Sequence, residues 1–513
     1  MQMQMQRLRT PVSVGVALLL TACAAVKEPK PFTEDENKER AKVDQLRMYE
    51  QQEPVTGPIT FYEAAARALK YNLDYRLKLM ESALAANLRD VSSHEMLPRL
   101  VASAGRSGRS NDSGGTSIGI EDRQVSLRPS TSEERYHTVA GLGLSWSTLD
   151  FAVGYYRTAQ KADQILMAEE RRRKVAQNVL QDVRSAYWRA LGAQRLLPQV
   201  DGLLSRTQDA LRQAREAQDK GLLPRQEILA YQRALLDSVS LLTARRQDLE
   251  FAQAELRALM SLPPGAPMQL VDAPDPALPK LGADLSQLEQ VALVRRPEIQ
   301  EEWYRKRVNQ RDLDIAKAQL WPNVGVSLGA RYDSNMYLYN DQWRAAGIDV
   351  SINLLRLLQL PSLNAAQESQ SQTDDARRIA LSMAVLTQVR IGALRYSLAM
   401  QELQFANQSL KVDTELLDYA RSAKKTSVGS DLEVIRAEGR FLLSRYQREA
   451  AQSSAEAAWG RLYNSVGLDV FPQQIDSHDV KTLAGEIERM TTDVESYRLI
   501  GAVPGDGSPN LAR

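Results

Sequence analysis

The chain has 513 residues, of which 43% are hydrophobic and 25% are charged, so it is long and apolar enough to bury a core. Its 65 basic and 64 acidic residues leave a formal net charge of +1, which argues against a nucleic-acid-binding protein because such proteins have a basic excess or stripe. One cysteine, Cys23, excludes an internal disulfide, and the three scattered histidines have no metal-ligand spacing.

The N-terminus resembles a bacterial lipoprotein signal peptide. Arg7 and Arg9 precede a short apolar run, Val12–Leu20, which is too short to span a membrane because a spanning helix needs ~20 apolar residues. The run ends in Leu-Thr-Ala-Cys, which is similar to the lipobox whose cysteine becomes the acylated first residue of the mature chain. We therefore expect residues 1–22 to be a lipoprotein signal peptide and Cys23 to carry the lipid. The alternative is an ordinary secretory signal.

The segment after the cysteine is polar and contains four prolines. Ala24 stands where an aspartate would favour retention in the inner membrane, so it favours delivery to the outer membrane. We expect residues 23–58 to form a lipid-anchored, extended linker, because proline-rich linkers are extended spacers.

The first two predicted strands lie near Arg99–Arg106 and Val139–Ser147. The second of them alternates Leu142, Leu144 and Trp146 with glycine and serine. A period of two is typical of a strand with two unlike faces. The segment between the strands is polar and rich in glycine and serine, so we expect a long loop there.

Two long helices should follow. Apolar positions three and four apart run from Tyr156 to about Asp219, a span of roughly 90 Å at 1.5 Å per residue. Pro198 should kink or interrupt this helix, since it removes one backbone hydrogen bond. A partner helix should run from about Arg225 to Ser261, and small inward alanines favour an antiparallel coiled-coil hairpin.

The same order of elements occurs a second time. Pro98 and Pro322, each at the start of a strand, are 224 positions apart. Gly141 and Gly347, each in the following strand, are 206 positions apart, and the difference of 18 lies in the long polar loop of the first copy. The chain is therefore expected to contain two tandem copies of one helix–strand–strand–helix–helix unit.

The second copy predicts strands at Asn323–Asp333 and Gly347–Leu354, a short connecting loop and a second helical hairpin. The expected division of the chain is a first structural repeat at 59–262, a proline-rich inter-repeat linker at 263–284, a second structural repeat at 285–468 and a partly disordered C-terminal tail at 469–513.

The four strands have the length and chemistry of membrane strands. Each is close to the ~9–11 residues that a tilted strand needs to cross a bilayer, and its polar face carries Gly, Ser, Asn and Asp. The alternative is a soluble, half-buried sheet. Four strands cannot close a barrel, and open edges are not tolerated in lipid, so several chains would have to share one barrel. Aromatic residues cluster at the strand ends, as in an interfacial girdle, at Trp146, Trp321, Tyr332, Tyr337, Tyr339 and Trp343.

In order, duplication and spacing, these features resemble the TolC-like outer-membrane efflux channels, also called outer-membrane factors. The resemblance covers about Ile59 to Leu468. Leu73 stands where the first copy of the family often has proline, and Ser427 aligns with Gly221 of the first copy. The motifs that carry the resemblance are Ala68-Leu69, Ala292-Leu293 with Arg296-Pro297-Glu298, the strand-opening Pro98 and Pro322, Ser145 to Asp150, and the hairpin turns Gly221-Leu222 and Ser427-Val428-Gly429.

The resemblance implies a mainly α fold with a small β part, in which two tandem repeats give long antiparallel coiled-coil helices and four membrane strands. It implies a homotrimer that shares a twelve-stranded β-barrel and a twelve-helix periplasmic tunnel in the outer membrane of a Gram-negative bacterium. The channel would be the passive exit duct of a tripartite efflux or type I secretion system, supplied by an inner-membrane pump through a periplasmic adaptor protein. Its extracellular loops would be Ser107–His137 and Ser334–Gln342.

The two hairpin turns are the expected adaptor-docking tips, because they carry small or apolar residues where charged ones would be expected. The alternative is that each glycine only ends its helix. Asp431 and Glu433 are candidates for the periplasmic entrance, where they could pair with Arg436 or Lys424; solvated acids at a helix N-terminus are the alternative. The docking tips are Gly221, Leu222, Leu223, Val428 and Gly429.

Two other classes of function fit less well. The sequence has no nucleophile elbow, phosphate loop or metal cluster, so we expect neither enzymatic activity nor a cofactor. The main alternative is a lipid-anchored coiled-coil periplasmic adaptor or scaffold protein. An adaptor has one helical hairpin between lipoyl-like and β-barrel domains, whereas this chain predicts two hairpins and four isolated strands.

Overall fold

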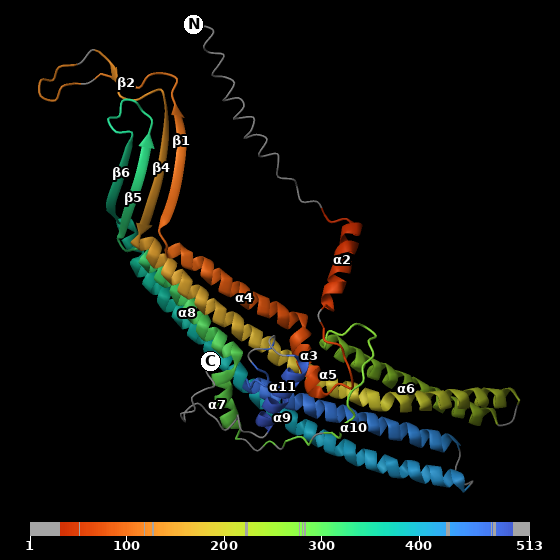
Figure 1. Ribbon diagram of the computed structural model, residues 1–513. Helices are drawn as coiled ribbons and strands as arrows, with labels where there is room; N and C mark the ends of the chain where they lie inside the picture. The colour runs from red at the N-terminus through yellow and green to blue at the C-terminus, as the bar shows by residue number, and fades with distance from the viewer. Residues whose placement is uncertain are drawn as a thin grey trace. The chain divides into compact units, whose positions relative to one another are not determined.

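Long helices and a four-stranded sheet make up most of the protein (Figure 1). The chain divides into two units, Met1–Gln52 and Glu53–Arg513. The structure is a computed structural model that describes residues 31–495 except 51, 117, 126–127, 221–223, 276, 280, 282–283, 427–430, 473–474 and 476–478.

The described part of the first unit contains helix α2, Glu34–Met48. The Thr33 hydroxyl accepts a hydrogen bond from the Glu36 amide at 3.3 Å, and the Glu36 carboxylate accepts one from the Thr33 amide at 2.8 Å. This reciprocal cap stabilises the start of a helix. The extended conformation predicted for residues 23–58 is therefore wrong over α2, because the prolines of the segment flank this stretch and none lies within it.

The second unit contains two copies of one arrangement: two helices, a strand, a connection, a second strand, and a long helix followed by a shorter one. The helices are α3 (Phe61–Tyr71), α4 (Leu73–Ser93), α5 (Thr148–Asp219), α6 (Arg225–Leu259), α7 (Leu285–Arg295), α8 (Pro297–Ala318), α9 (Leu360–Lys425), α10 (Asp431–Val466) and α11 (Val480–Glu495), with the 3₁₀ helices η1 (His94–Met96) and η2 (Leu354–Gln359). The strands are β1 (Arg99–Gly108), β2 (Gly114–Gly115), β3 (Ser130–Thr131), β4 (Tyr136–Ser147), β5 (Asn323–Asp333) and β6 (Gln342–Ser351).

The junction between the first two helices of each copy shows the repeat in the backbone. Asn72 separates α3 from α4 with φ −62° and ψ 125°. Arg296, 224 positions later, separates α7 from α8 with φ −62° and ψ 127°. Asn72 caps α4 by accepting a hydrogen bond from the Tyr75 amide at 3.1 Å. In the second copy Pro297 begins α8. The first amide of a helix has no partner within the helix, so a proline there costs no hydrogen bond.

Helix α5 continues for 72 residues, and Pro198 does not interrupt it. Leu196, Val200 and Leu203 on either side of this proline are buried in one apolar cluster with leucines of α6 and α10. This packing holds the helix together across the missing hydrogen bond. The sheet lies at one end of α4, α5, α8 and α9, while the far ends of the α5–α6 and α9–α10 pairs point away from it (Figure 1).

The main apolar core lies where α3, α5, α7, α9 and α10 converge. Trp459 and Tyr396 are buried there, with ring centroids 5.1 Å apart. Helix α11 packs on α3 and adds Leu483 and Ile487 to this core. Helix α11 lies within the tail predicted to be partly disordered, and its buried residues recur at helical spacing.

The four-stranded sheet is antiparallel throughout, in the order β1-β4-β5-β6. Its last strand ends at Ser351, so the predicted strand Gly347–Leu354 is wrong at its C-terminal end. The Asn353 side chain accepts hydrogen bonds from the amides of Leu355 at 3.1 Å and Arg356 at 3.4 Å. These bonds start η2 and thereby end the extended backbone.

Candidate functional site

One face of the four-stranded sheet is apolar over the part nearest the helices, whereas Arg106 and Arg344 lie on the same face toward the loop end. Because successive side chains of a strand point to opposite faces, the register decides which residues share a face. The side chains on this face are mostly exposed, and Ile348 is 77% exposed. Such a contiguous exposed apolar surface marks contact with an apolar medium or partner. Two neighbouring cross-strand rows on this face are Leu100–Leu144–Leu328–Ala346 and Trp146–Val326–Ile348.

The opposite face of the sheet carries mostly small and polar side chains, with Val101, Val139 and Trp343 as larger apolar ones. At Gly143 no atom lies within 4 Å of the position that a Cβ would occupy, so this part of the face is open. At Gly325 the Asp349 carboxylate lies over the glycine, with Oδ1 2.5 Å from the position of such a Cβ. Rows on this face are Val101–Gly143–Gly329–Ala345, Arg99–Ser145–Ser327–Gly347 and Ser147–Gly325–Asp349.

Aromatic side chains lie at both ends of the sheet. At the helix end, the Trp146 indole N–H donates to the Met96 carbonyl at 3.3 Å, and its ring lies 5.9 Å from that of Phe151. Trp321, which precedes β5, is 72% exposed. The exposed rings at the loop end are Tyr136, Tyr332, Tyr337, Tyr339 and Trp343. Tyr136 and Phe151 join the aromatic residues that we predicted. Tyr136 begins β4, three residues before the predicted start of the strand, and Phe151 lies in α5, just after β4.

The two connections at the loop end of the sheet are tied together by buried Asn335. Its amide oxygen accepts a hydrogen bond from the Glu134 amide at 3.1 Å, and its amide nitrogen donates to the Ser132 carbonyl at 3.0 Å. The His137 Nδ1 atom lies 2.7 Å from the Asp333 carboxylate. Both predicted loops thus contribute to one connected structure.

The two hairpin turns lie partly outside the described residues. All five predicted docking-tip residues lie outside the described residues: Gly221, Leu222, Leu223, Val428 and Gly429. Asp431 begins α10 and forms an ion pair with Lys424 at the end of α9, one of the two pairings considered from the sequence. Both side chains are at least half exposed, so this pair contributes at most ~1 kcal/mol to stability. Glu433 is exposed two residues further along the helix.

A buried ion cluster that sequence reasoning missed joins α5, α10 and α11. The Arg184 guanidinium is buried and donates to Glu456 at 2.9 Å and to Glu495 at 3.5 Å. It also lies over the rings of Phe61 and Tyr463, 4.7 Å and 5.5 Å from their centroids. Burial raises the pKa of Glu456, although Arg184 acts in the opposite direction. The available sequence signal was a charged residue at helical spacing from Leu180 and Tyr187, on the mainly apolar stripe of the long helix.

The Arg296-Pro297-Glu298 motif forms a second polar joint. Buried Arg296 donates to the Asn464 carbonyl at 3.2 Å, the Gln388 side chain at 2.8 Å and the Glu298 carboxylate at 3.0 Å. Lys174 Nζ lies 2.5 Å from the same carboxylate. Burial would raise the pKa of Glu298, but these two cations outweigh it and hold the pKa below its usual value. The motif therefore fastens α8 to α5, α9 and α10.

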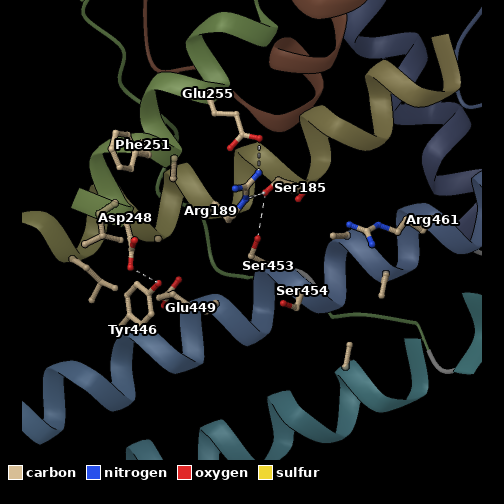
Figure 2. Close-up of a pocket in the computed structure, with 18 of the residues that line it drawn as sticks. Ser185, Arg189, Asp248, Phe251, Glu255, Tyr446, Glu449, Ser453, Ser454 and Arg461 are labelled. Carbon is tan, nitrogen blue, oxygen red and sulfur yellow. Dashed lines mark hydrogen bonds and ion pairs between the residues drawn. The ribbon is translucent and has the colours of Figure 1, made fainter. Parts of the chain in front are cut away.

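A groove of about 640 Å³ lies where α5, α6 and α10 meet, with α9 on its remaining side (Figure 2). The described residues that line it include no histidine or cysteine, and its polar contacts join neighbouring helices. This groove therefore has the character of a packing joint. The contacts are Arg189 with Glu255 at 2.8 Å, Ser453 with the Ser185 carbonyl at 3.3 Å, and Tyr446 with Asp248 at 3.4 Å.

The described residues hold no cluster of three or more His, Cys, Asp or Glu side chains that could bind a metal ion. Among the described helices, none combines the length and the apolarity that crossing a membrane requires. The predicted lipid-attachment residue, Cys23, lies outside the described residues.

Solved structures share this fold. The Campylobacter jejuni CmeC outer membrane channel is 12% identical, with a TM-score of 0.62 over 91% of this chain and 98% of that one. The open state of the Neisseria gonorrhoeae MtrE outer membrane channel is 16% identical, with a TM-score of 0.58 over 79% and 88%. The Vibrio cholerae outer membrane protein VceC is 14% identical, with a TM-score of 0.58 over 79% and 96%. The predicted mainly α fold with long paired helices and a few strands is confirmed.

A search of curated protein sequences gave no match. The outer membrane efflux protein family, in contrast, matches in two blocks, residues 67–261 and 288–468, which together span most of the chain. Each block contains one copy of the repeat, with its strand pair and helical hairpin. The chain belongs to the outer membrane efflux protein family.

Proposed function

We propose that this chain is the outer-membrane channel of a tripartite efflux or type I secretion system. Three copies would join their sheets into one twelve-stranded barrel and their hairpins into a periplasmic tunnel. The channel would be a passive exit duct in a Gram-negative outer membrane, receiving substrates from an inner-membrane pump through a periplasmic adaptor protein.

The observation that carries the proposal is a sheet with one exposed apolar face and two open edges. Strands β1 and β6 stand at the two ends of the strand order, and each is paired on one side only within the described chain. In lipid, each unpaired backbone group costs several kcal/mol, so both edges need partner strands. Further copies of the chain supply the strands that each edge lacks, and at least two copies are needed to reach the ~8 strands that can close. The choice of three copies follows the resemblance to the outer-membrane factors.

Oligomeric state and conductance test this proposal. The purified protein should appear as a trimer by native mass spectrometry, and it should form ion-conducting pores in planar bilayers. A monomer that forms no pores would contradict the proposal.

A Cys23→Ser variant distinguishes the proposed channel from the alternative, a lipid-anchored periplasmic adaptor. A barrel remains in the outer-membrane fraction after loss of the lipid, because its strands hold it there, whereas a lipid-anchored adaptor becomes soluble. The proposed acylation is tested on the unaltered protein, where mass spectrometry should find a lipid on Cys23. An unmodified N-terminus at Ala24 or beyond would remove the anchor from the proposal.

We extend the proposal to the hairpin tips as adaptor-docking elements. Leu222→Asp with Val428→Asp should stop export while the trimer still assembles, because charge at an apolar contact prevents docking. Neutralising Asp431 and Glu433 should instead alter the ion selectivity of reconstituted channels if these acids ring the entrance. Normal export in the first variant would remove the docking role, and unchanged selectivity in the second would remove the ring.

A further inference from the structure

The segment after β6 carries an exposed leucine cluster that the proposed function does not use. Helix η2 has the sequence Leu-Leu-Arg-Leu-Leu-Gln, and α9 begins with a further leucine. The exposed fractions of two members, Leu355 and Leu358, are 77% and 76%. We define the leucine turn as Leu354, Leu355, Leu357, Leu358 and Leu360.

The geometry of a 3₁₀ helix sorts these side chains into two kinds of surface. Residues three apart eclipse one another in such a helix. Leu354 therefore stacks with Leu357, and Leu355 with Leu358, which gives two apolar columns. The third column is polar and contains Arg356 and Gln359. The Arg356 side chain makes no hydrogen bond or ion pair with any other residue that the structure describes, and it is exposed.

The corresponding segment of the first copy is built differently. Ser147 occupies the position of Asn353 and caps a helix as Asn353 does, by accepting from the Asp150 amide at 3.0 Å. Asp150 stands where the second copy has Arg356, and it lies 3.4 Å from Arg99. The leucine turn and its unpaired cation thus belong to the second copy, at the open edge of the sheet.

We infer that the leucine turn is an interfacial anchor that enters the periplasmic leaflet of the outer membrane, with Arg356 beside the lipid phosphates. This inference rests on the proposed function, because it requires the apolar face of the sheet to contact lipid. That face includes Ile348 and Val350 of β6, and the apolar residues Ile352 and Leu354 follow just beyond the end of the strand.

The length of β6 sets the depth of the turn. Ten residues, Gln342–Ser351, span ~33 Å at ~3.3 Å per residue, and a tilt of ~40° reduces this to ~25 Å across the membrane. The apolar band of such barrels is also ~25 Å tall. Strand β6 therefore crosses the band by itself, and η2 begins at the boundary between acyl chains and head groups. An apolar surface with an adjacent cation binds at that level, because leucine enters the acyl region while arginine reaches the phosphates.

Fluorescence quenching by brominated lipids tests the anchor in the assembled full-length protein. Cys23→Ser removes the one cysteine, and Leu358→Cys then provides a single site for an environment-sensitive fluorophore. The labelled protein is reconstituted in phosphatidylethanolamine–phosphatidylglycerol vesicles containing lipids brominated either near the head group or near the chain end. Ile348→Cys on β6 reports on the proposed lipid face. Leu394→Cys on α9, 59% exposed and 36 residues beyond Leu358, is the matched control.

We expect the fluorescence of the label at position 358 to be quenched, more strongly by bromine near the head group than by bromine near the chain end. The fluorescence of the label at position 394 should not be quenched. Quenching at 348 without quenching at 358 would overturn the anchor and leave the proposed function standing. A fluorophore at 358 that is blue-shifted yet unquenched would show that protein covers the turn, which also overturns the anchor. Quenching at neither 348 nor 358 would contradict both the anchor and the proposed function. Quenching at 394 as strong as at 358 would also overturn the anchor, because the lipid contact would then not be confined to the leucine turn.

Discussion

Arginine at two adjacent positions of β4 should have opposite consequences. Leu142 lies on the apolar face of the sheet and Gly143 on the polar face. Leu142 is five residues from the helix end of the strand, Ser147, which places it ~13 Å into a ~25 Å apolar band for a tilted strand. Arginine facing lipid near the middle of the band costs ~2–4 kcal/mol per chain, a factor of about 30 to 1,000 in the folding equilibrium. Three copies each incur this cost.

Gly143→Arg is the matched control because the same side chain is added one position away. No described atom lies within 4 Å of the position of a Cβ there, so the first atom of the new side chain meets no steric conflict. In a barrel the new guanidinium would enter the water-filled interior. We therefore expect Gly143→Arg to assemble and to change the ion selectivity of the pore.

The assay measures trimer yield in outer-membrane fractions and the conductance of the purified channels. Leu142→Arg should lower the trimer yield severely, whereas Gly143→Arg should retain it and shift the reversal potential toward anions. Full assembly of Leu142→Arg, or loss of assembly in Gly143→Arg alone, would refute the assignment of the two faces.

Three further predictions concern the helical part, and circular dichroism of the detergent-solubilised protein during thermal unfolding measures each. Gly467→Ala should lower the free energy of unfolding by ~2–5 kcal/mol, because φ is +77° and a Cβ would lie 2.9 Å from backbone atoms. The control Gly265→Ala, with φ +78° and nothing within 4 Å of the Cβ position, should lower it by only about 1 kcal/mol. Equal losses in the two variants would contradict the steric argument. Arg184→Met should cost ~3–5 kcal/mol because it leaves Glu456 buried without its partner, and Glu456→Gln in the same chain should restore part of the loss. The pKa of Glu298 is lowered from 4.5 by its cation neighbours, so its contribution to stability is present above that pH and is lost as the pH falls below it; Glu298→Gln should remove this pH dependence, and an unchanged profile would contradict it.

Local periodicity was sufficient for the elements that repeat one pattern over many residues. Strand β5 spans Asn323–Asp333, as its alternation predicts, and α6 begins at Arg225 after the predicted turn. The repeat offset of 224 positions predicted the equivalence of the α3–α4 and α7–α8 junctions, and the backbone angles at Asn72 and Arg296 confirm it. These features depend on neighbours a few residues apart, which the sequence displays directly.

Two elements differ from the prediction because of polar side-chain contacts with the nearby backbone. The cap formed by Thr33 and Glu36 makes a helix where proline content suggested an extended linker. The Asn353 side chain ends β6 earlier than the alternation alone suggests. In both places side chains bind the backbone amides at one end of a helix, a contact that depends on single residues and that proline content or alternation does not display.

The sequence by itself determined the two copies, the alternation of the strands and the long amphipathic helices, because each of these is a periodic property of neighbouring residues. The tertiary structure decided which distant residues meet. Arg184 reaches Glu456 across 272 positions, and Asn335 joins Glu134 across 201. It also decided the register by which the apolar residues of the four strands gather on one face near the helices. Cross-strand rows and buried ion pairs depend on how whole elements pack against one another. A pattern of neighbouring residues does not show which elements, hundreds of positions apart, come into contact.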